Sequence, residues 1–290
     1  MPNSRFDLTP EDYAYEPDRS AIEMIKATGV LPYLVKHLAL SRLEKDLSSR
    51  LSREAREAIR PSRVDALLKP CAIALSLETL PKVLVIKGAQ PNAFTFGSED
   101  HASLVLNSSI LSLLTEVELS ALLAHELTHI RSGHMLYHTV AELLGGGIGF
   151  SASFLGLSVV TVPVRLALLS WHRESEVTAD RGSLLVVDDL DVMKSLLTKL
   201  AVCSSGQFDI KREKAGMVES ASELFSTHPL YVNRYKRLKE FSENQQFLRS
   251  RRKIETKLNL LRALIPVCRF CGARKAIEDL FCPACERCQA

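Results

Sequence analysis

The sequence lacks a strong charge of either sign. Its 37 Lys and Arg residues against 34 Asp and Glu residues leave a net charge of +3. So small an excess excludes a strongly basic nucleic-acid-binding protein as the default interpretation. Thirteen Gly and twelve Pro in 290 residues are too few for a collagen-like or low-complexity chain. With 46% hydrophobic and 24% charged residues the chain can bury a core, which excludes global disorder.

An apolar run of seven residues is missing from the first thirty positions, which carry acidic residues throughout. We therefore expect no secretory signal peptide and a cytoplasmic protein. Five of the seven Cys residues lie in the last 23 residues, and four of these form two close pairs. Without a signal peptide, this pattern indicates metal ligation in a reducing compartment rather than disulfides.

The order of hydrophobic patterns predicts an α+β fold that is mostly helical with a small β-sheet. Residues 1–80 carry apolar side chains at helical spacing. Three short β-rich segments follow, at residues 82–88, 92–97 and 103–107. Helical patterns then return, including those of residues 171–187 and 191–202.

One of these helices has a well-defined predicted start. Thr115 and Glu118 form a Thr-x-x-Glu capping box directly before an apolar helical run. This pattern predicts a helix that begins near Glu116, and we expect it to continue through His138.

The segment His125-Glu126-Leu127-Thr128-His129 places two imidazoles four residues apart in this helix. Positions i and i+4 lie about 40° apart in projection, so both side chains face the same way. Two neutral imidazoles are good zinc ligands, and Glu126 beside them is placed to take a proton from water at the metal. The segment therefore predicts a catalytic zinc centre.

A catalytic zinc ion needs a third protein ligand and an open position. Glu176 is the best candidate, because Asp180 follows it one turn later on the same helix face. A carboxylate there can hold the second nitrogen of a liganding imidazole. Glu174 is the competing candidate, but it projects about 200° away from Glu176 and no carboxylate follows it by one turn.

Four landmarks occur in a fixed order: Asn92-Ala93-Phe94 with Gly97, His125-Glu126-x-x-His129, Glu176-x-x-Ala179-Asp180-Arg181, and His228-Pro229 with Arg234. In this order the chain resembles the HtpX/CAAX-prenyl-protease family of zinc metallopeptidases, within the gluzincin group. The resemblance covers roughly residues 80–245, and it implies a zincin-like fold.

The resemblance also implies roles for individual residues. It implies that Glu126 is the general base and that three residues bind the zinc ion: His125, His129 and Glu176. A polypeptide substrate would pair with the strand around residues 92–97 and contact Asn92, Ala93 and Phe94. His228 and Arg234 would face the reacting carbonyl, where fixed donors or cations stabilise negative charge.

The predicted function is that of a zinc-dependent metalloendopeptidase that hydrolyses polypeptides. The alternative, from another class, is a chaperone-like or protein-binding module on the same scaffold with little turnover. An intact base argues for the enzyme, because a binding module does not need Glu126.

Many proteins of this family carry membrane spans between the two ligand motifs. Here residues 143–164 form an uncharged stretch of 22 residues. His129 and Glu176 must meet at one ion, so an odd number of spans between them is excluded. Two spans need about 40 apolar residues, whereas residues 143–171 offer 29 with Arg165 among them. The stretch is therefore either an apolar insertion packed on the body or a peripheral hairpin that contacts a membrane surface.

The C-terminal segment carries Cys268-x-x-Cys271 and Cys282-x-x-Cys285, with Cys288 as a spare or alternative ligand. This spacing resembles a small zinc ribbon that holds a second, structural zinc ion. Two roles stay open for it: recruiting a protein partner or substrate, and capping the chain. Residues 234–275 contain thirteen Lys and Arg against three Glu, but we do not expect a nucleic-acid partner.

Together these patterns predict three regions. They are an N-terminal helical region (1–80), a zinc metallopeptidase catalytic domain (81–245), and a basic linker helix with the ribbon-like segment (246–290).

Overall fold

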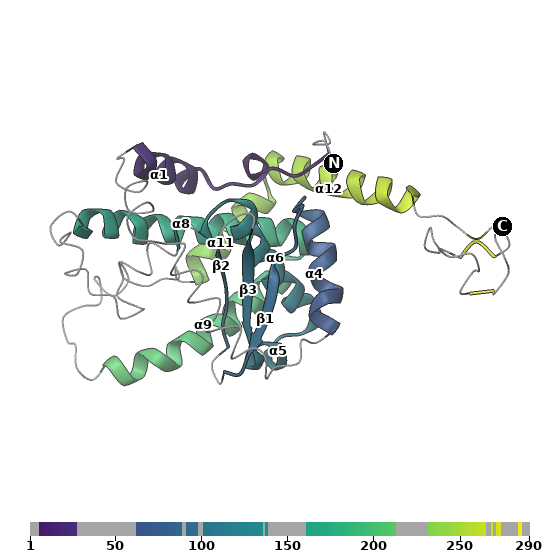
Figure 1. The fold of residues 1–290 in the computed structure, drawn as a ribbon. Coiled ribbons are helices and arrows are strands. Elements are labelled where there is room, and N and C mark those ends of the chain that lie inside the picture. Colours follow the sequence, from purple (N-terminus) through teal and green to yellow (C-terminus); the bar gives the residue numbers. More distant parts are fainter. Residues whose placement is uncertain are drawn as a thin grey trace.

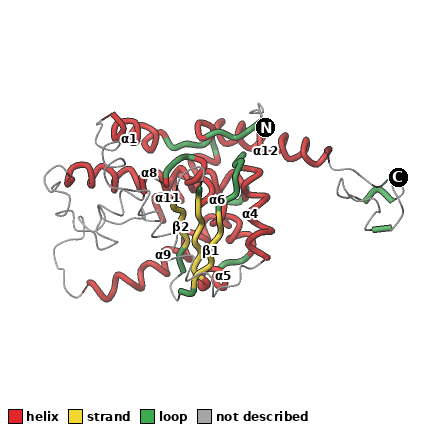
Figure 2. The backbone as a smooth tube through the Cα atoms, viewed as in Figure 1, coloured by secondary structure: helices red, strands yellow, loops and turns green. Residues whose placement is uncertain are grey.

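The computed structural model describes residues 6–27, 62–88, 91–97, 101–135, 137–138, 161–212, 231–264, 268, 271–273 and 284–285. A small sheet lies against a set of helices (Figures 1 and 2). The helical elements are η1 Pro10–Asp12, α1 Glu16–Ala27, α4 Ser62–Ala74, α5 Ser108–Leu113, α6 Glu116–Arg131, α8 Thr161–Val187, α9 Leu190–Arg212, α11 Tyr231–Ser242 and α12 Gln245–Leu264. The strands are β1 Lys82–Ile86, β2 Ala93–Gly97 and β3 Ala102–Asn107. The mixed, mostly helical architecture agrees with the predicted α+β class.

The sheet has the strand order β1-β3-β2, with β1 parallel and β2 antiparallel to β3. Alternate side chains face opposite sides, as the pleat requires. One side joins the main core through Val83, Val85, Leu104 and Leu106. The other side forms a smaller cluster of Leu84, Phe96 and Val105. Within the part of the chain that the structure describes, β2 has no strand on its outer side.

Helix α6 begins as the capping box predicts. The Thr115 side chain accepts a hydrogen bond from the backbone N–H of Glu118, and the Glu118 carboxylate accepts one from the backbone N–H of Thr115. These reciprocal bonds satisfy two donors that a helix N-terminus leaves unpaired. The cap therefore fixes the rotation of the helix face that carries the two histidines ten residues later.

The end of α6 corrects the expectation that the helix continues through His138, because it ends at Arg131. Gly133 has a φ of +69°, which favours glycine. Its N–H donates to Ile130 O at 3.1 Å, and the N–H of His134 donates to His129 O at 3.0 Å. This pair of bonds is a Schellman motif. The turn ends the helix and brings His134 back beside His129.

The core extends across sequence regions that lie far apart. A single hydrophobic cluster includes Leu8 and Tyr13 near the N-terminus, Leu123 of α6, Phe241 of α11 and Ile254 of α12. Helix α6 contacts α4, α8, α9 and β2. It is buried almost throughout, which places its two histidines inside the protein.

Two other predicted helices are longer than expected. Residues 171–187 form the C-terminal part of α8, which begins at Thr161, and α9 extends from Leu190 to Arg212. Most of the uncharged stretch, residues 143–160, lies outside the described residues, as do residues 28–61. Among the helices that are described, none combines the length and the apolar character that a membrane crossing requires.

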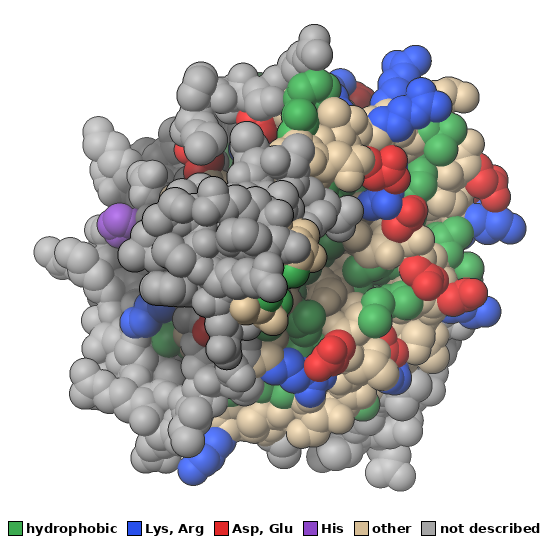
Figure 3. Space-filling model, turned by 90° about the vertical axis from the view of Figure 1, so that its right-hand side faces the viewer, with side chains coloured by type: hydrophobic (Ala, Val, Ile, Leu, Met, Phe, Trp, Pro, Cys, Tyr) green, Lys and Arg blue, Asp and Glu red, His purple; other side chains and the backbone are tan. Residues whose placement is uncertain are grey.

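Lys and Arg side chains alternate with Asp and Glu on the face shown in Figure 3. Neither sign gathers into one patch among the described residues of that face. This distribution agrees with the small net charge of +3.

Glu118 gives the fold a predictable dependence on pH. Burial opposes its ionisation, but donors from Lys199, Ser195 and Thr115 outweigh burial and lower its pKa from 4.5 to about 2. A lowered folded-state pKa stabilises the protein above the unfolded-state value, and this stability is lost as the pH falls toward 2. We expect Glu118→Gln to lower the free energy of unfolding at pH 7 by about 2 kcal/mol.

The measurement is urea denaturation of Glu118→Gln and wild type at pH 7 and at pH 3. The difference between them should shrink at the lower pH. Glu116→Gln is the matched control, because Glu116 is exposed in the same first turn. A difference that stays constant with pH would contradict the assignment.

Candidate metal centre

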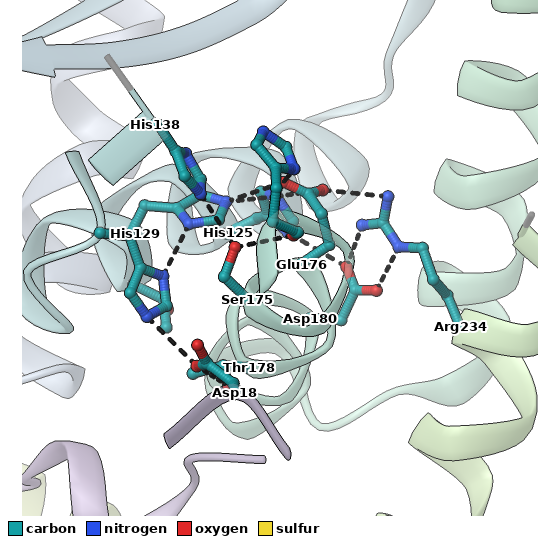
Figure 4. A network of polar contacts seen from close by, with 12 residues as sticks. Asp18, His125, His129, His138, Ser175, Glu176, Thr178, Asp180 and Arg234 are labelled. Carbon is teal, nitrogen blue, oxygen red and sulfur yellow. Dashed lines mark hydrogen bonds and ion pairs between the residues drawn. The ribbon is translucent and has the colours of Figure 1, made fainter. Parts of the chain in front are cut away.

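The three predicted ligands of the catalytic ion meet inside the protein. His125 Nε2 lies 3.2 Å from His129 Nε2. Glu176 reaches both imidazoles from α8, with Oε2 at 3.4 Å from His125 Nε2 and Oε1 at 3.3 Å from His129 Nε2. All three side chains are buried, and Figure 4 shows their polar atoms pointing toward one another.

These separations fit a zinc ion. Tetrahedral zinc with bonds of about 2.05 Å to nitrogen and oxygen places its ligand atoms about 3.3 Å apart. The three side chains, called the ligand triangle below, make contacts of 3.2 Å between the two Nε2 atoms, 3.3 Å from His129 Nε2 to Glu176 Oε1 and 3.4 Å from His125 Nε2 to Glu176 Oε2. Two imidazoles and a carboxylate are also the donor set of a catalytic zinc site, which leaves one position open. The residues present therefore fit the ion that the sequence predicts.

The two histidines differ electrostatically in the metal-free chain. Burial lowers the pKa of His125, but hydrogen bonds to Asp180 and Glu176 outweigh burial and raise it to about 10. Burial dominates at His129 and lowers its pKa to about 3. Metal ions compete with protons for imidazole nitrogen, so metal binding at this centre depends on pH.

Asp180 lies where the sequence predicts a supporting carboxylate. Its Oδ1 is 3.0 Å from His125 Nδ1, which leaves Nε2 of that imidazole directed at the triangle. Arg234 of α11 donates from Nε to Asp180 Oδ2 at 2.6 Å and from Nη2 to Oδ1, and its Nη1 lies 3.2 Å from Glu176 Oε2. Burial opposes ionisation of Asp180, but Arg234 and His125 outweigh it and keep its pKa below the usual value.

The geometry also separates the two candidates for the third ligand. Glu176 contacts both histidines, whereas Glu174 forms an ion pair with Arg237 of α11 at 2.6 Å. The two carboxylates leave α8 in different directions, as their spacing of two residues predicts. Glu174 is thus placed outside the triangle.

Sequence reasoning missed a chain of contacts behind His129. His129 Nδ1 lies 3.0 Å from His134 Nδ1, and His134 Nε2 lies 3.2 Å from Asp18 Oδ2 (Figure 4). Gly133 was the available signal for His134, because a glycine in the last turn marks a helix end. Asp18 comes from α1, and no local pattern indicates its long-range contact.

Two further histidines border the centre. His138 Nε2 lies 2.9 Å from Ser175 Oγ, and the His138 ring stacks on the His172 ring with centroids 4.1 Å apart. Burial and the neighbouring imidazoles lower the pKa of His138 well below its usual value. His138 and His172 each have a ligand atom within 4.8 Å of one on Glu176, so both side chains line the metal centre.

The predicted substrate-contacting residues lie at the start of β2, the strand that packs beside α6. Asn92 is exposed and its carbonyl accepts a hydrogen bond from Asn107 N at 2.9 Å. Ala93 pairs with Leu106, and Phe94 lies on the smaller-cluster side of the sheet. His228 lies outside the described residues.

At the C-terminus, three of the predicted cysteine ligands converge. Cys268, Cys271 and Cys285 have sulfur atoms within 4.8 Å of one another, and Cys268 Sγ is 3.6 Å from Cys285 Sγ. Tetrahedral zinc–thiolate bonds place sulfur atoms about 3.8 Å apart. Gly272, with a φ of +73°, forms the tight turn after the first pair and donates to Cys268 O at 2.8 Å. Cys282 and Cys288 lie outside the described residues.

Comparison with known proteins shows the family to which the chain belongs. The sequence model of peptidase family M48 matches residues 58–242, which is more than half of the chain. A plastoglobule-localized metallopeptidase 48 of Arabidopsis thaliana is 31% identical over 204 residues, covering 64% of this chain and 58% of that protein. A protease HtpX homologue of Burkholderia thailandensis is 28% identical over 200 residues, covering 58% of this chain and 70% of that protein. Another, of a Sulfurovum species, is 30% identical over 189 residues, covering 55% and 68% respectively.

The matched range contains α6 and α8, and therefore the whole His125, His129 and Glu176 triangle. The chain spans 58% of the length of the Arabidopsis protein. The chain belongs to peptidase family M48, a family of metallopeptidases.

Proposed function

We propose that this chain is a zinc-dependent metalloendopeptidase in which His125, His129 and Glu176 hold the ion. The observation that best supports this function is the buried convergence of their side chains, whose closest polar atoms lie 3.2, 3.3 and 3.4 Å apart, with each oxygen of Glu176 facing one imidazole. A protein-binding surface has no need of three converging donors at tetrahedral spacing. Family membership supports the same conclusion.

The chemistry follows from the residues around the triangle. When bound, a zinc ion supplies a Lewis acid that lowers the pKa of water and polarises a carbonyl. Glu126 lies about 100° from His125 and about 60° from His129 around α6, so it borders the face that carries both imidazoles. As general base, its carboxylate takes a proton from water and then transfers that proton to the leaving nitrogen of the cleaved peptide. Glu126 is 6% exposed, and a charge so buried interacts strongly with a reacting group.

Arg234 and Asp180 act as supports in this proposal. Asp180 fixes the orientation of His125 through Nδ1, and Arg234 balances the charge of both Asp180 and Glu176. Such supporting contacts orient metal ligands and tune their basicity. The role that the family resemblance implies for Arg234, facing the reacting carbonyl, stays a prediction, as does that of His228.

A polypeptide substrate would add to the sheet at β2. An exposed strand edge offers unpaired backbone donors and acceptors to an extended peptide. Because β2 packs beside α6, a chain paired there would lie close to the helix of the metal centre. We propose contacts with Asn92, Ala93 and Phe94 on this basis.

Metal removal tests the proposed function. Treatment with a chelator is expected to stop cleavage of an unfolded, fluorescently labelled polypeptide, because the Lewis acid is lost. The decrease should be about 10³-fold or more. Added zinc should restore cleavage in proportion to the zinc bound. Cleavage that persists in protein shown by elemental analysis to be metal-free would overturn the proposal.

A variant of the cysteine site supplies the control. We propose that Cys268, Cys271, Cys282 and Cys285 bind a structural zinc ion in a zinc ribbon. Wild type should then hold two zinc ions per chain, and the double variant Cys268→Ser/Cys271→Ser should hold one. Because the catalytic triangle does not involve these thiolates, the double variant should still cleave.

The family match does not favour the alternative of a chaperone-like module with little turnover. We retain the division into residues 1–80, 81–245 and 246–290 as a proposal. We also propose a protein partner that binds the zinc ribbon and a membrane contact through residues 143–164.

A further inference from the structure

We propose that Asp18 and His134 are positioning residues for the metal ligand His129, so that a segment N-terminal to the matched peptidase region completes the metal centre. This inference rests on the proposed zinc site. It concerns a series of hydrogen bonds, called the relay below, that runs from the Asp18 carboxylate through His134 to the metal ligand His129.

The direction of each hydrogen bond in the relay is fixed by His129. Its Nε2 faces Glu176 Oε1 at 3.3 Å, so a zinc ion held at the ligand triangle would take the lone pair of that nitrogen. A neutral imidazole carries one N–H, which must then be on Nδ1. That N–H points at His134 Nδ1, 3.0 Å away, so His134 Nδ1 accepts. The proton of His134 is therefore on Nε2, which donates to Asp18 Oδ2 at 3.2 Å.

The Asp18 carboxylate, at the far end of these hydrogen bonds, is buried and fixed by other donors. Its side chain is 3% exposed. Trp171 Nε1 donates to Oδ1 at 2.6 Å, and Thr178 Oγ1 donates to Oδ2 at 2.5 Å. Thr178 Oγ1 itself accepts from the backbone N–H of Tyr15 at 3.0 Å, which commits its own proton to Asp18. The carboxylate thus receives three directed donors, two of them from α8, the helix of Glu176.

The arrangement gives each liganding imidazole its own buried carboxylate. Asp180 contacts His125 directly at 3.0 Å, whereas Asp18 reaches His129 through His134. A carboxylate behind a liganding imidazole fixes its tautomer and raises its basicity. The Schellman turn at Gly133 is what places His134 between the two.

The N-terminal segment that contains Asp18 packs against the rest of the protein. Leu8 and Tyr13 are fully buried. The Tyr13 hydroxyl lies 3.2 Å from Ser132 Oγ, in the turn that leads to His134. Arg131 donates to Leu8 O at 3.2 Å. These contacts hold the segment against the end of α6, although it precedes the matched range of residues 58–242.

The same hydrogen bonds argue against the alternative that His134 is a metal ligand. His129, His134 and His138 offer ligand atoms within 4.8 Å of one another, as a second metal site would. Both ring nitrogens of His134 already have partners, at 3.0 and 3.2 Å. Metal binding by His134 would break one of those contacts, whereas a positioning role preserves the contacts with both His129 and Asp18.

The experiment uses the full chain with zinc bound and has two readouts besides activity. Chelator competition measures the zinc affinity of wild type, Asp18→Asn and His134→Gln. Both variants should bind catalytic zinc about 10–100-fold more weakly. Glu16→Gln is the matched control, because Glu16 lies on the same helix with a side chain that is 68% exposed. Cobalt substitution separates the two sites, since thiolate ligands give an intense near-ultraviolet absorption that imidazole and carboxylate ligands lack.

The second readout needs no variant. Nitrogen-15 NMR of labelled histidines in the wild type should show His134 protonated on Nε2 alone and His129 protonated on Nδ1. A proton on His134 Nδ1, unchanged zinc affinity in folded Asp18→Asn, or loss of an additional zinc ion in His134→Gln would each overturn the positioning role. A wild type whose His129 binds no zinc would instead overturn the proposed function itself.

Discussion

Replacing Glu126 with Gln is expected to abolish peptide hydrolysis while the protein still binds catalytic zinc. The amide keeps the size and shape of the side chain but cannot accept a proton from water. General-base catalysis contributes about 10²–10⁴-fold, so the rate should fall by about 10³-fold. The zinc content should not change, because Glu126 is not among the three ligands. The measurement is cleavage of an unfolded polypeptide together with elemental analysis.

Glu174→Gln is the matched control for this substitution. It makes the same chemical change two residues from Glu176, at a side chain that pairs with Arg237. This variant should keep its zinc and most of its activity. A Glu126→Gln protein that cleaves at the wild-type rate would disprove the role of the base. Loss of zinc from Glu174→Gln would show that the third ligand has been misassigned.

Replacing Gly182 with Ala is expected to destabilise the protein and to weaken zinc binding. Helices α6 and α8 pack tightly where Gly182 faces Thr128. A Cβ at position 182 would lie 2.2 Å from Thr128 Oγ1 and 2.5 Å from Thr128 Cγ2. Thr128 is fully buried and its hydroxyl donates to Ala124 O at 2.7 Å, so it has no room to move.

The helices must therefore separate, at a cost of about 3 kcal/mol in the free energy of unfolding. His129 follows Thr128 and Glu176 lies on α8, so the separation also widens the ligand triangle. Zinc affinity should fall at least about tenfold, which corresponds to 1.4 kcal/mol. Denaturation in urea and chelator competition measure the two effects.

The double variant Gly182→Ala/Thr128→Ala tests the cause. It removes the two closest atoms but leaves Thr128 Cβ at 2.9 Å from the added methyl group. Partial recovery, with clear non-additivity of the two substitutions, is expected for residues in contact. Simple addition of the two single-variant effects would show that the close approach is not the reason.

Local patterns in the sequence were sufficient for much of this site. The capping box of Thr115 and Glu118 fixes the start of α6, and helix periodicity then determines which side chains share a face. The same periodicity favours Glu176 over Glu174 and places Asp180 one turn beyond it. The three strands were also predictable, because each is a short run of β-favouring residues between polar turns.

Contacts between distant segments were not predictable in this way. The approach of Asp18 to His134 joins residues separated by more than a hundred positions, and it depends on how α1 packs against α8. The family pattern pointed to Arg234, but its pairing with both Asp180 and Glu176 depends on the docking of α11. The early end of α6 had a local signal in Gly133, which the apolar periodicity around it outweighed in our prediction.

The side chains that surround the centre extend from position 18 to position 234. During synthesis on the ribosome, both histidines of α6 therefore emerge about a hundred residues before the arginine that neutralises the carboxylates of α8. Until α11 has emerged and docked, two buried acids face each other without their cation. In the proposed arrangement the ion pairs around the metal centre are therefore complete only after the last of its elements has left the ribosome.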